Sequence, residues 1–401
     1  MPLHGHCGTI PLYFCGGKMR EQSDQQLKEI IAREIAANGG IRFSRFMELC
    51  LYHPESGYYM KDRTRIGKKG DFFTSSSVHS LFGALIARQL DQMWQLLGCE
   101  SFTLVEQGAG EGHLAKDILD SVRHEHPDFY RRLNYRIVEV SPDNRQRQSA
   151  NLSSHADIIS WSTFEELEPV TGCFLSNELV DAFPVHLAEK RDGAYFEVYV
   201  SNTDAGFGEQ LRPDDGRLET HFSWLGSSPC EGNRGEANLA AVDWIRQVSD
   251  RLEKGFVLSV DYGYPAEELY APFRRNGTLM CYHRHSSNED PYQLVGEQDI
   301  TAHVDFTALQ KAGLERGLHT LYFDVQYRFL MALGFIEQLM QLQAAAKSET
   351  EAAALRMTLK NLVMPDEGMG STFKVLIQGK GVGSPELICQ RRIADIPIPL
   401  S

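Results

Sequence analysis

The chain has 401 residues, of which 42% are hydrophobic and 23% charged, so it can build a large core and wholesale disorder is excluded. Its net charge of −14 argues against a general nucleic-acid binder, because affinity for the phosphate backbone needs clustered Lys and Arg. No apolar run is long enough for a membrane span. Eight scattered cysteines, none in a C-x-x-C pair, predict reduced thiols and a cytoplasmic location.

The first 18 residues lack helical periodicity and the Arg-rich pattern of a transit peptide. We expect residues 1–18 to be disordered, or translation to start at Met19. Apolar spacing of three and four predicts helices over 22–38 and 78–98. The glycine- and aromatic-rich stretch between them is expected to be ordered, and residues 19–100 are predicted to form an N-terminal helical and cover segment.

From residue 102 onward, apolar strands alternate with helices, which predicts an α/β fold with a parallel sheet covered on both faces. Residues 101–184 form the first part of this core and 236–401 the second, with helices near 236–253 and 326–346. Between them, residues 185–235 contain short alternating strands and Gly/Asp turns, typical of an antiparallel insertion. The last predicted strands are LHTLYFDV and STFKVLIQG.

A glycine-rich turn follows the first core strand, in VEQGAGEGHLA. Gly108, Gly110 and Gly112 let the backbone approach a ligand at the carboxyl end of that strand. Glu106 places a carboxylate beside this turn, which disfavours a phosphate and favours a cation or an amine. S-adenosylmethionine carries both a sulfonium and an ammonium group, although the glycines alone are equally consistent with a tight turn.

Acidic residues also follow the next two strands. Glu139 ends YRIVEV, where a carboxylate can accept hydrogen bonds from both hydroxyls of a ribose. GCFLSNELVDAF delivers Asn177, Glu178 and Asp181 to the same edge of the sheet, where a pair of carboxylates can hold a guanidinium. The alternative for this pair is a helix N-terminus with favourable acids. His-x-His pairs lack partners at zinc spacing, so no metal site is predicted.

These segments together resemble the MidA-like S-adenosylmethionine-dependent methyltransferases, relatives of the mitochondrial complex I assembly-factor methyltransferase. The resemblance spans about residues 27–380 and is carried in order by nine segments: IRFSRFMELCLYHPESGYY, IGKKGDFFTSSSVHSLFG, VEQGAGEGHLAKDIL, YRIVEVSP, SNELVDAFPV, VDYGYP, GTLMCYHRH, DITAHVDF and MGSTFKVL. It implies a Rossmann-like, seven-strand class I methyltransferase core with an N-terminal helical segment and inserted β and helical elements.

The resemblance also implies roles for individual residues. Glu106 and the three glycines would hold the methionine end of the cofactor, Glu139 the ribose, and Asn177 with Glu178 the region near the transferable methyl group. Thr74, in GDFFTSS, would lie in a loop that covers the cofactor. The chain departs from the family in SSSVHS after Thr74 and in EQGAGEG, where a proline often follows the first acid.

The mitochondrial members of the family that the chain resembles are associated with arginine methylation of a complex I subunit. A protein acceptor, such as a respiratory complex I subunit, is therefore expected, and a homodimer is one option for the oligomeric state. Two alternatives remain: an assembly chaperone that binds the cofactor with little catalysis, and a small-molecule methyltransferase. A dinucleotide oxidoreductase is a more distant one, since Glu106 fits phosphate poorly.

A final hypothesis concerns DITAHVDF, where polar and apolar residues alternate before a helix. We expect His303 to face the acceptor as a third catalytic residue beside Glu178 and Asp181, with a side-chain pKa near neutrality for accepting a proton. The alternative places His303 on the surface and makes Asp305 the cap of the following helix.

Overall fold

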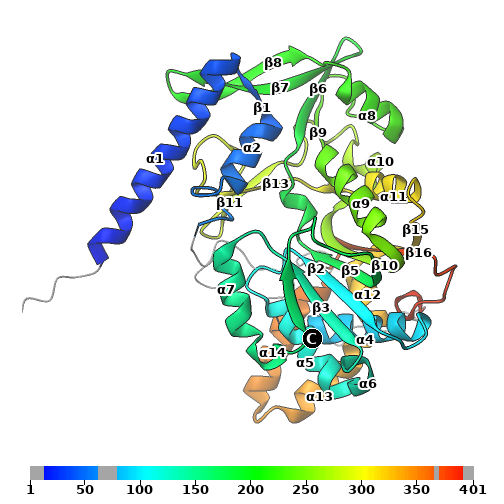
Figure 1. Ribbon diagram of the computed structural model, residues 1–401. Helices are drawn as coiled ribbons and strands as arrows, with labels where there is room; N and C mark the ends of the chain where they lie inside the picture. Colours follow the sequence, from blue (N-terminus) through cyan, green and yellow to red (C-terminus); the bar gives the residue numbers. More distant parts are fainter. Residues whose placement is uncertain (1–12, 62–78, 365–369, 392–401) are drawn as a thin grey trace, which may run out of the picture.

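The computed structural model describes residues 13–61, 79–364 and 370–391. Within these residues, the centre of the molecule is a mixed sheet in which seven strands follow the order β15-β16-β10-β5-β2-β3-β4 (Figure 1). An eighth strand, β14, pairs with the end of β10. The strands from β4 to β10 run parallel, whereas β16 is antiparallel to both β10 and β15. The strands are β2 (Phe102–Gln107), β3 (Leu133–Val138), β4 (Ile159–Ser162), β5 (Val170–Asn177), β10 (Leu252–Tyr264), β14 (Val304–Asp305), β15 (His319–Val325) and β16 (Phe373–Lys380).

Helices cover both faces of this sheet because its strands are apolar on both sides. Leu104 packs into one core and its neighbour Val105 into the other, as expected from the alternation of side chains along a strand. The first core is closed by α4 (Leu81–Leu96), α5 (His113–Glu125), α6 (Pro127–Tyr130), α12 (Gln326–Ala332), α13 (Phe335–Ala345) and α14 (Glu349–Val363). The second is closed by α8 (Arg217–Leu225), α9 (Leu239–Arg251), α10 (Ala266–Leu269) and α11 (Phe306–Leu314). The predicted α/β fold class is confirmed.

Two smaller sheets lie beyond the carboxyl ends of the parallel strands. In the first, β7 pairs with β6, β8 and β1, and β6 also pairs with β9, with every pairing antiparallel. Its strands are β1 (Ile41–Arg42), β6 (His186–Arg191), β7 (Ala194–Thr203), β8 (Gly206–Pro213) and β9 (Arg234–Ala237). The second joins β11 (Met280–His283), β12 (Ser286–Asn288) and β13 (Asp299–Thr301).

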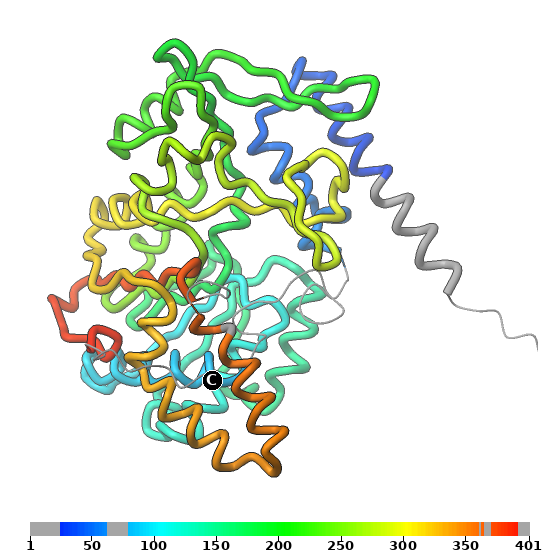
Figure 2. Tube along the Cα trace, turned by 180° about the vertical axis from the view of Figure 1, so that it is seen from behind, coloured from blue at the N-terminus to red at the C-terminus, as the bar shows by residue number. Residues whose placement is uncertain are grey.

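A third apolar core ties the N-terminal segment to these two sheets. It is formed by α1 (Tyr13–Asn38), α2 (Phe43–Tyr52), the middle of β7 and the strands β11 and β13. Figure 2 shows α2 (blue) beside the β11–β13 segment (yellow), although more than 200 positions separate them in the sequence. The face above the strand ends is therefore assembled from distant parts of the chain.

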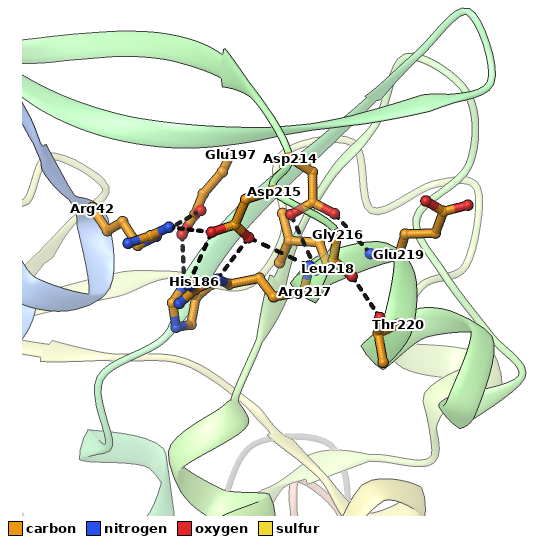
Figure 3. A network of polar contacts seen from close by, with 10 residues as sticks. All are labelled: Arg42, His186, Glu197, Asp214, Asp215, Gly216, Arg217, Leu218, Glu219 and Thr220. Atoms are coloured by element: carbon orange, nitrogen blue, oxygen red, sulfur yellow. Dashed lines mark hydrogen bonds and ion pairs between the residues drawn. The ribbon is translucent and has the colours of Figure 1, made fainter.

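A network of charged side chains reinforces this junction (Figure 3). Glu197 on β7 is 1% exposed, and its carboxylate accepts from Arg42 Nε at 3.0 Å and contacts His186 Nδ1 at 2.5 Å. Arg42 also reaches Asp215, which in turn pairs with Arg217 at the start of α8. A buried carboxylate is costly unless it is paired, so these contacts fix β1 against the antiparallel sheet.

The structure differs from the sequence-based expectations in two helical regions. Helix α1 begins at Tyr13, so the backbone of residues 13–18 is helical rather than disordered, while residues 1–12 lie outside the described part. The single helix expected over 326–346 is two helices, α12 and α13, because Gly334 between them adopts a φ of 97° that a helix cannot contain. The remaining helical elements of the described residues are α7 (Pro142–Asn151) and the 3₁₀ turns η1 (Ser153–His155), η2 (Val180–Ala182) and η3 (Ile388–Gln390).

Candidate active site

The candidate site lies where four parallel strands end side by side. Gln107 of β2 is in register with Val138 of β3 and with Ser176 of β5, and Asn177 of β5 is in register with Val260 of β10. The next residues along each strand therefore meet at one edge of the sheet, as ligand-binding residues do in open α/β folds.

The glycine turn after β2 uses backbone conformations that favour glycine. Gly108, Gly110 and Gly112 have φ values of 77°, 54° and 83°, a region that favours glycine. A Cβ on Gly108 would lie 2.9 Å from Leu179 Cδ1, and one on Gly112 would lie 3.2 Å from Leu152 Cδ1. The turn therefore tolerates no larger side chain at Gly108 without movement and brings bare backbone to the strand edge.

Glu106 lies on β2 just before this turn and is 2% exposed. Its Oε2 accepts a hydrogen bond of 2.7 Å from the hydroxyl of Tyr135. Burial raises the pKa of the carboxyl from 4.5 to about 7, partly offset by this bond. A cation placed beside Glu106 would stabilise the ionised form, which agrees with the expected amine.

Glu139 follows β3 and is 7% exposed, with a pKa raised by burial. Its Oε1 accepts from the backbone N of Ser141 at 2.8 Å, and its Oε2 accepts from Gln148 at 2.9 Å and Asn144 at 3.3 Å. A carboxylate has about four acceptor sites, so about one is left. In this arrangement Glu139 can accept one further hydrogen bond, from one hydroxyl. To accept hydrogen bonds from both ribose hydroxyls, it would have to lose its hydrogen bond to one of the two side-chain amides.

The end of β5 brings together Asn177, Glu178 and Asp181. The amide of Asn177 donates to Glu178 Oε1 at 3.0 Å, while its Oδ1 is buried with no hydrogen-bond partner among the described residues. Glu178 has a φ of 53°, a strained conformation for a residue with a side chain, and such strain is concentrated at functional sites. Asp181, in the 3₁₀ turn η2 (Val180–Ala182), is 5% exposed.

Asp261 follows the part of β10 that pairs with β5, and it holds this turn in place. Its Oδ2 accepts from the backbone N of Val180 at 2.9 Å and of Leu179 at 3.2 Å. The next residue, Tyr262, donates its hydroxyl to Asp181 Oδ2, and Asp181 Oδ1 is left buried and without a described partner. Burial raises the pKa of Asp181 to about 6 and that of Asp261 well above its usual value. Nothing in the sequence indicated that Asp261 organises this turn.

Two tyrosines from the N-terminal segment lie beside the turn that follows β5. No role in the site was predicted for them from the sequence. The Tyr52 hydroxyl donates to the carbonyl of Ala182 at 2.9 Å, and the Tyr59 hydroxyl donates to Asp299 at 2.8 Å. Their rings stack at 5.5 Å, and the pKa values of both phenols are raised by burial and then by Asp299 and Asp181. The segment LYHPESGYY signalled aromatic content, but only the fold places it next to the end of β5.

His303 requires a correction. It lies between β13 and β14, so the alternating strand expected over DITAHVDF is interrupted at this residue. Its ring packs against Tyr262 and Tyr264 at 5.4 Å each, and burial, with a smaller effect of Arg274 and Lys374, lowers its pKa to about 4. The near-neutral pKa was therefore wrong, because burial disfavours the charged ring. Asp305 does cap α11, accepting from Ala308 N at 3.0 Å.

The cover loop, metal sites and membrane spans can be judged only over the residues that the structure describes. Thr74 lies outside them, so its predicted place in a cover loop stays a prediction. In the part of the chain that the structure describes, no group of three or more His, Cys, Asp or Glu side chains is placed to hold a metal ion. No described helix is both long and apolar enough to cross a membrane.

The strand-end residues fit S-adenosylmethionine. The glycine turn offers bare backbone, Glu106 a buried carboxylate for an ammonium group, Glu139 one remaining acceptor site, and Asn177 an acceptor oxygen that lacks a donor among the described residues. A pyrophosphate would instead place negative charge beside Glu106, at an energetic cost. This donor set fits a cationic amino-acid cofactor better than a dinucleotide.

Comparison with known proteins agrees with this assignment. Residues 85–324 match the family described as S-adenosyl-L-methionine-dependent methyltransferases. A crystal structure of a COG1565 superfamily member from Burkholderia thailandensis, bound to S-adenosyl-homocysteine, is 32% identical and superposes with a TM-score of 0.83, covering 95% of this chain and 97% of that one.

Curated relatives are more distant in sequence. The mitochondrial protein arginine methyltransferase NDUFAF7 homologue of Drosophila melanogaster is 29% identical over 90% of this chain and 86% of its own. NDUFAF7 of Danio rerio is 26% identical over 86% and 84%, respectively. These relatives are named mitochondrial, which overturns the expected cytoplasmic location. That expectation depended on cysteine usage, which separates oxidising from reducing compartments but does not separate one reducing compartment from another.

The family match covers more than half of the chain, and the Burkholderia structure shares both its fold and 32% of its sequence. The strand-end site supplies the carboxylates and bare backbone that this cofactor needs. The chain therefore belongs to the family of S-adenosyl-L-methionine-dependent methyltransferases.

Proposed function

We propose that this methyltransferase acts on a guanidinium nitrogen of an arginine side chain in a protein. The observation that carries the proposal lies in the turn that follows β5, where Asp181 Oδ1 is a buried acceptor without a described donor. A guanidinium offers five N–H donors in a planar fork, so it can satisfy such acceptors while remaining charged beside carboxylates.

The residues around this turn also favour binding of a guanidinium group. Glu178, Asp181 and Asp299 supply carboxyl groups, and Tyr52 and Tyr59 supply stacked rings. Aromatic faces and carboxylates both attract a planar cation. The curated relatives are named protein arginine methyltransferases, which supports the same acceptor.

The chain's residues divide the chemical work in this proposal. S-adenosylmethionine supplies an electrophilic methyl group when bound. Glu178 and Asp181 orient the guanidinium, and by drawing its positive charge toward two nitrogens they leave electron density on the third. Tyr262 holds Asp181 Oδ2, so Oδ1 is available to take the proton released by the methylated nitrogen. Burial raises the pKa of Asp181 and lowers that of His303, so Asp181 is the stronger base and suits this role better.

The first acceptor to test is a subunit of respiratory complex I, as the sequence resemblance suggests. Extracts of cells that lack this protein are incubated with isotopically labelled S-adenosylmethionine and the purified enzyme, and mass spectrometry locates the new methyl groups. We expect label on arginine nitrogen in a protein. Light scattering on the same preparation measures whether the enzyme is a homodimer.

A matched pair of variants assigns the chemistry to Asp181. Asp181→Asn keeps an acceptor for the Tyr262 hydroxyl but cannot take a proton, so turnover should fall by about 10²–10⁴-fold with little change in cofactor affinity. Asp243→Asn, on the exposed side of α9, should leave turnover unchanged. Label on a small molecule, or full turnover by Asp181→Asn, would contradict the proposal.

A further inference from the structure

A cavity of about 420 Å³ lies close to Asp181, with the ring of Tyr262 between His303 of the cavity lining and Asp181. It plays no part in the proposed reaction. Its lining includes Arg274, Thr278, Tyr282 and His303. The His303 ring contacts the ring of Tyr262, whose hydroxyl is bonded to Asp181. The cavity therefore neighbours the site proposed for the acceptor arginine.

One wall of the cavity is fixed by a buried carboxylate. Glu236, 3% exposed, accepts from Thr278 N at 2.9 Å, Thr278 Oγ1 at 3.0 Å and Leu279 N at 3.2 Å. The Thr278 hydroxyl oxygen in turn accepts from the backbone N of His303 at 3.0 Å. At Gly277, a Cβ would lie 2.1 Å from Glu236 Oε1, so the loop closes tightly on this carboxylate. The cavity is thus held open by the fold itself.

Two cations lie beside this wall. The guanidinium of Arg274 is 4.3 Å and the ammonium of Lys374 is 4.9 Å from the ring centre of Tyr264, which also contacts His303. Within the described residues, neither cation has a carboxylate oxygen within 4.0 Å. Lys374 is 8% exposed and, among described residues, bonds only to the carbonyls of Ser371 and Thr372. Glu268 and Asp324 interact electrostatically with Lys374. Arg274, in contrast, lines the cavity itself without a close carboxylate among the described residues, and so favours an anionic ligand there.

His303 adds a hydrogen-bonding atom. Its Nδ1 is buried with no partner among the described residues, and burial keeps the ring neutral. In one neutral tautomer Nδ1 carries a proton and can donate it to an acceptor. Arg274 donates Nε to the carbonyl of Glu268 at 3.1 Å, which fixes the guanidinium, and its terminal nitrogens have no hydrogen-bond partner among the described residues.

The two acidic residues that line the cavity, Glu209 and Glu289, do not pair with Arg274. Glu209 is paired with Arg234 at 2.8 Å and accepts from Tyr292 at 3.1 Å. Glu289 is exposed to solvent at the rim. The net preference of the inner cavity is therefore for a group that is negative and accepts hydrogen bonds.

We infer that this cavity is a specificity subsite that binds a carboxylate of the acceptor protein, an aspartate or glutamate close in sequence to the methylated arginine, through Arg274 and His303. This inference rests on the proposed arginine methylation for the identity of the acceptor. The cavity's affinity for a carboxylate does not depend on it.

The test uses the full-length enzyme and a set of nine-residue peptides with one central arginine and a single Glu or Gln at each other position in turn. We expect Glu at one position to raise kcat/KM about tenfold over Gln, mainly through KM, because the subsite binds without reacting. Arg274→Ala should abolish this preference, whereas Arg275→Ala, whose exposed side chain does not line the cavity, should keep it. Equal rates for all Glu and Gln pairs would overturn the inference.

A binding experiment separates failure of the subsite from failure of the proposed function. The ¹⁵N resonances of the His303 ring, assigned by their loss in His303→Gln, are followed during titration with N-acetylglutamate amide, N-acetylglutamine amide and succinate. A shift with the glutamate compound alone, in an enzyme that methylates no peptide, would refute arginine methylation but keep the carboxylate site. A shift with succinate at lower concentration than with the glutamate compound would identify a free metabolite and overturn the acceptor subsite, as would the absence of any shift.

Discussion

Glu106 couples cofactor binding to pH, because burial raises its pKa from 4.5 to about 7. The folded state holds this proton more tightly than the unfolded chain, so this group's contribution to stability is lost as pH rises from about 4.5 through about 7. Binding of an ammonium group has the opposite requirement, since it needs the ionised carboxylate.

We therefore expect the dissociation constant of S-adenosylmethionine to rise roughly tenfold between pH 8 and pH 6, as the ionised fraction of Glu106 falls. Isothermal titration calorimetry at both pH values measures this change. Glu106→Gln should bind weakly with little pH dependence across this range. If the wild-type affinity did not change with pH, Glu106 would not contact the ammonium group.

At the scale of elements, Gln148 on α7 connects three parts of the site. Its side chain is fully buried, and Nε2 donates to Gly110 O at 2.7 Å and to Glu139 at 2.9 Å, while Oε1 accepts from Trp161 on β4 at 2.8 Å. This one amide holds the glycine turn, the end of β3 and β4 in a fixed arrangement.

Replacing Gln148 with Leu keeps most of the volume but removes the amide partner of Gly110 O and Trp161 Nε1. We expect the free energy of unfolding to fall by about 1–3 kcal/mol for each unsatisfied group, and cofactor affinity to fall because the turn is no longer held. Urea denaturation and calorimetry measure the two effects. Gln146→Leu, at an exposed position of the same helix, is the matched control and should change neither.

The sequence predicted most of the core elements because their side chains are buried on both faces or alternate with a period of two. Segments such as FTLVEQ and STFKVLIQG became β2 and β16 with little change in their bounds. It did not predict β1, since the two residues Ile41–Arg42 form a strand only by pairing with β7 far along the chain. The approach of Tyr52 and Tyr59 to the site has the same non-local origin, and the burial of His303 depends on rings from β10.

At the scale of the whole molecule, the N-terminal helix docks through its second half. Leu27, Ile31 and Ile35 are at most 3% exposed in the third core, where they pack with α2 and the antiparallel sheet. In Figure 1, the N-terminal half of α1 extends away from the body of the molecule. The docked side chains of α1 among those whose burial the structure describes are therefore Leu27, Ile31 and Ile35.

A chain that starts at Met19 should match the full-length protein in thermal stability and cofactor binding, because it keeps all three docked residues. Ile31→Ala should lower the free energy of unfolding by about 2–5 kcal/mol, through lost burial and the cavity that remains. Differential scanning calorimetry compares the three proteins. A truncated chain that melted several degrees lower would show that residues 1–18 also pack.

The position of β16 has a consequence for synthesis on the ribosome. It is the last strand among the described residues, Phe373–Lys380, yet it lies between β10 and β15, where its backbone pairs with both. While the nascent chain is shorter than about 370 residues, β10 therefore presents an unpaired edge and β15 has no neighbour in the sheet, an arrangement that invites wrong pairing. Closure of the catalytic core is thus a late event of translation, and a transcript cut short before this strand yields a product with an open sheet rather than a smaller enzyme.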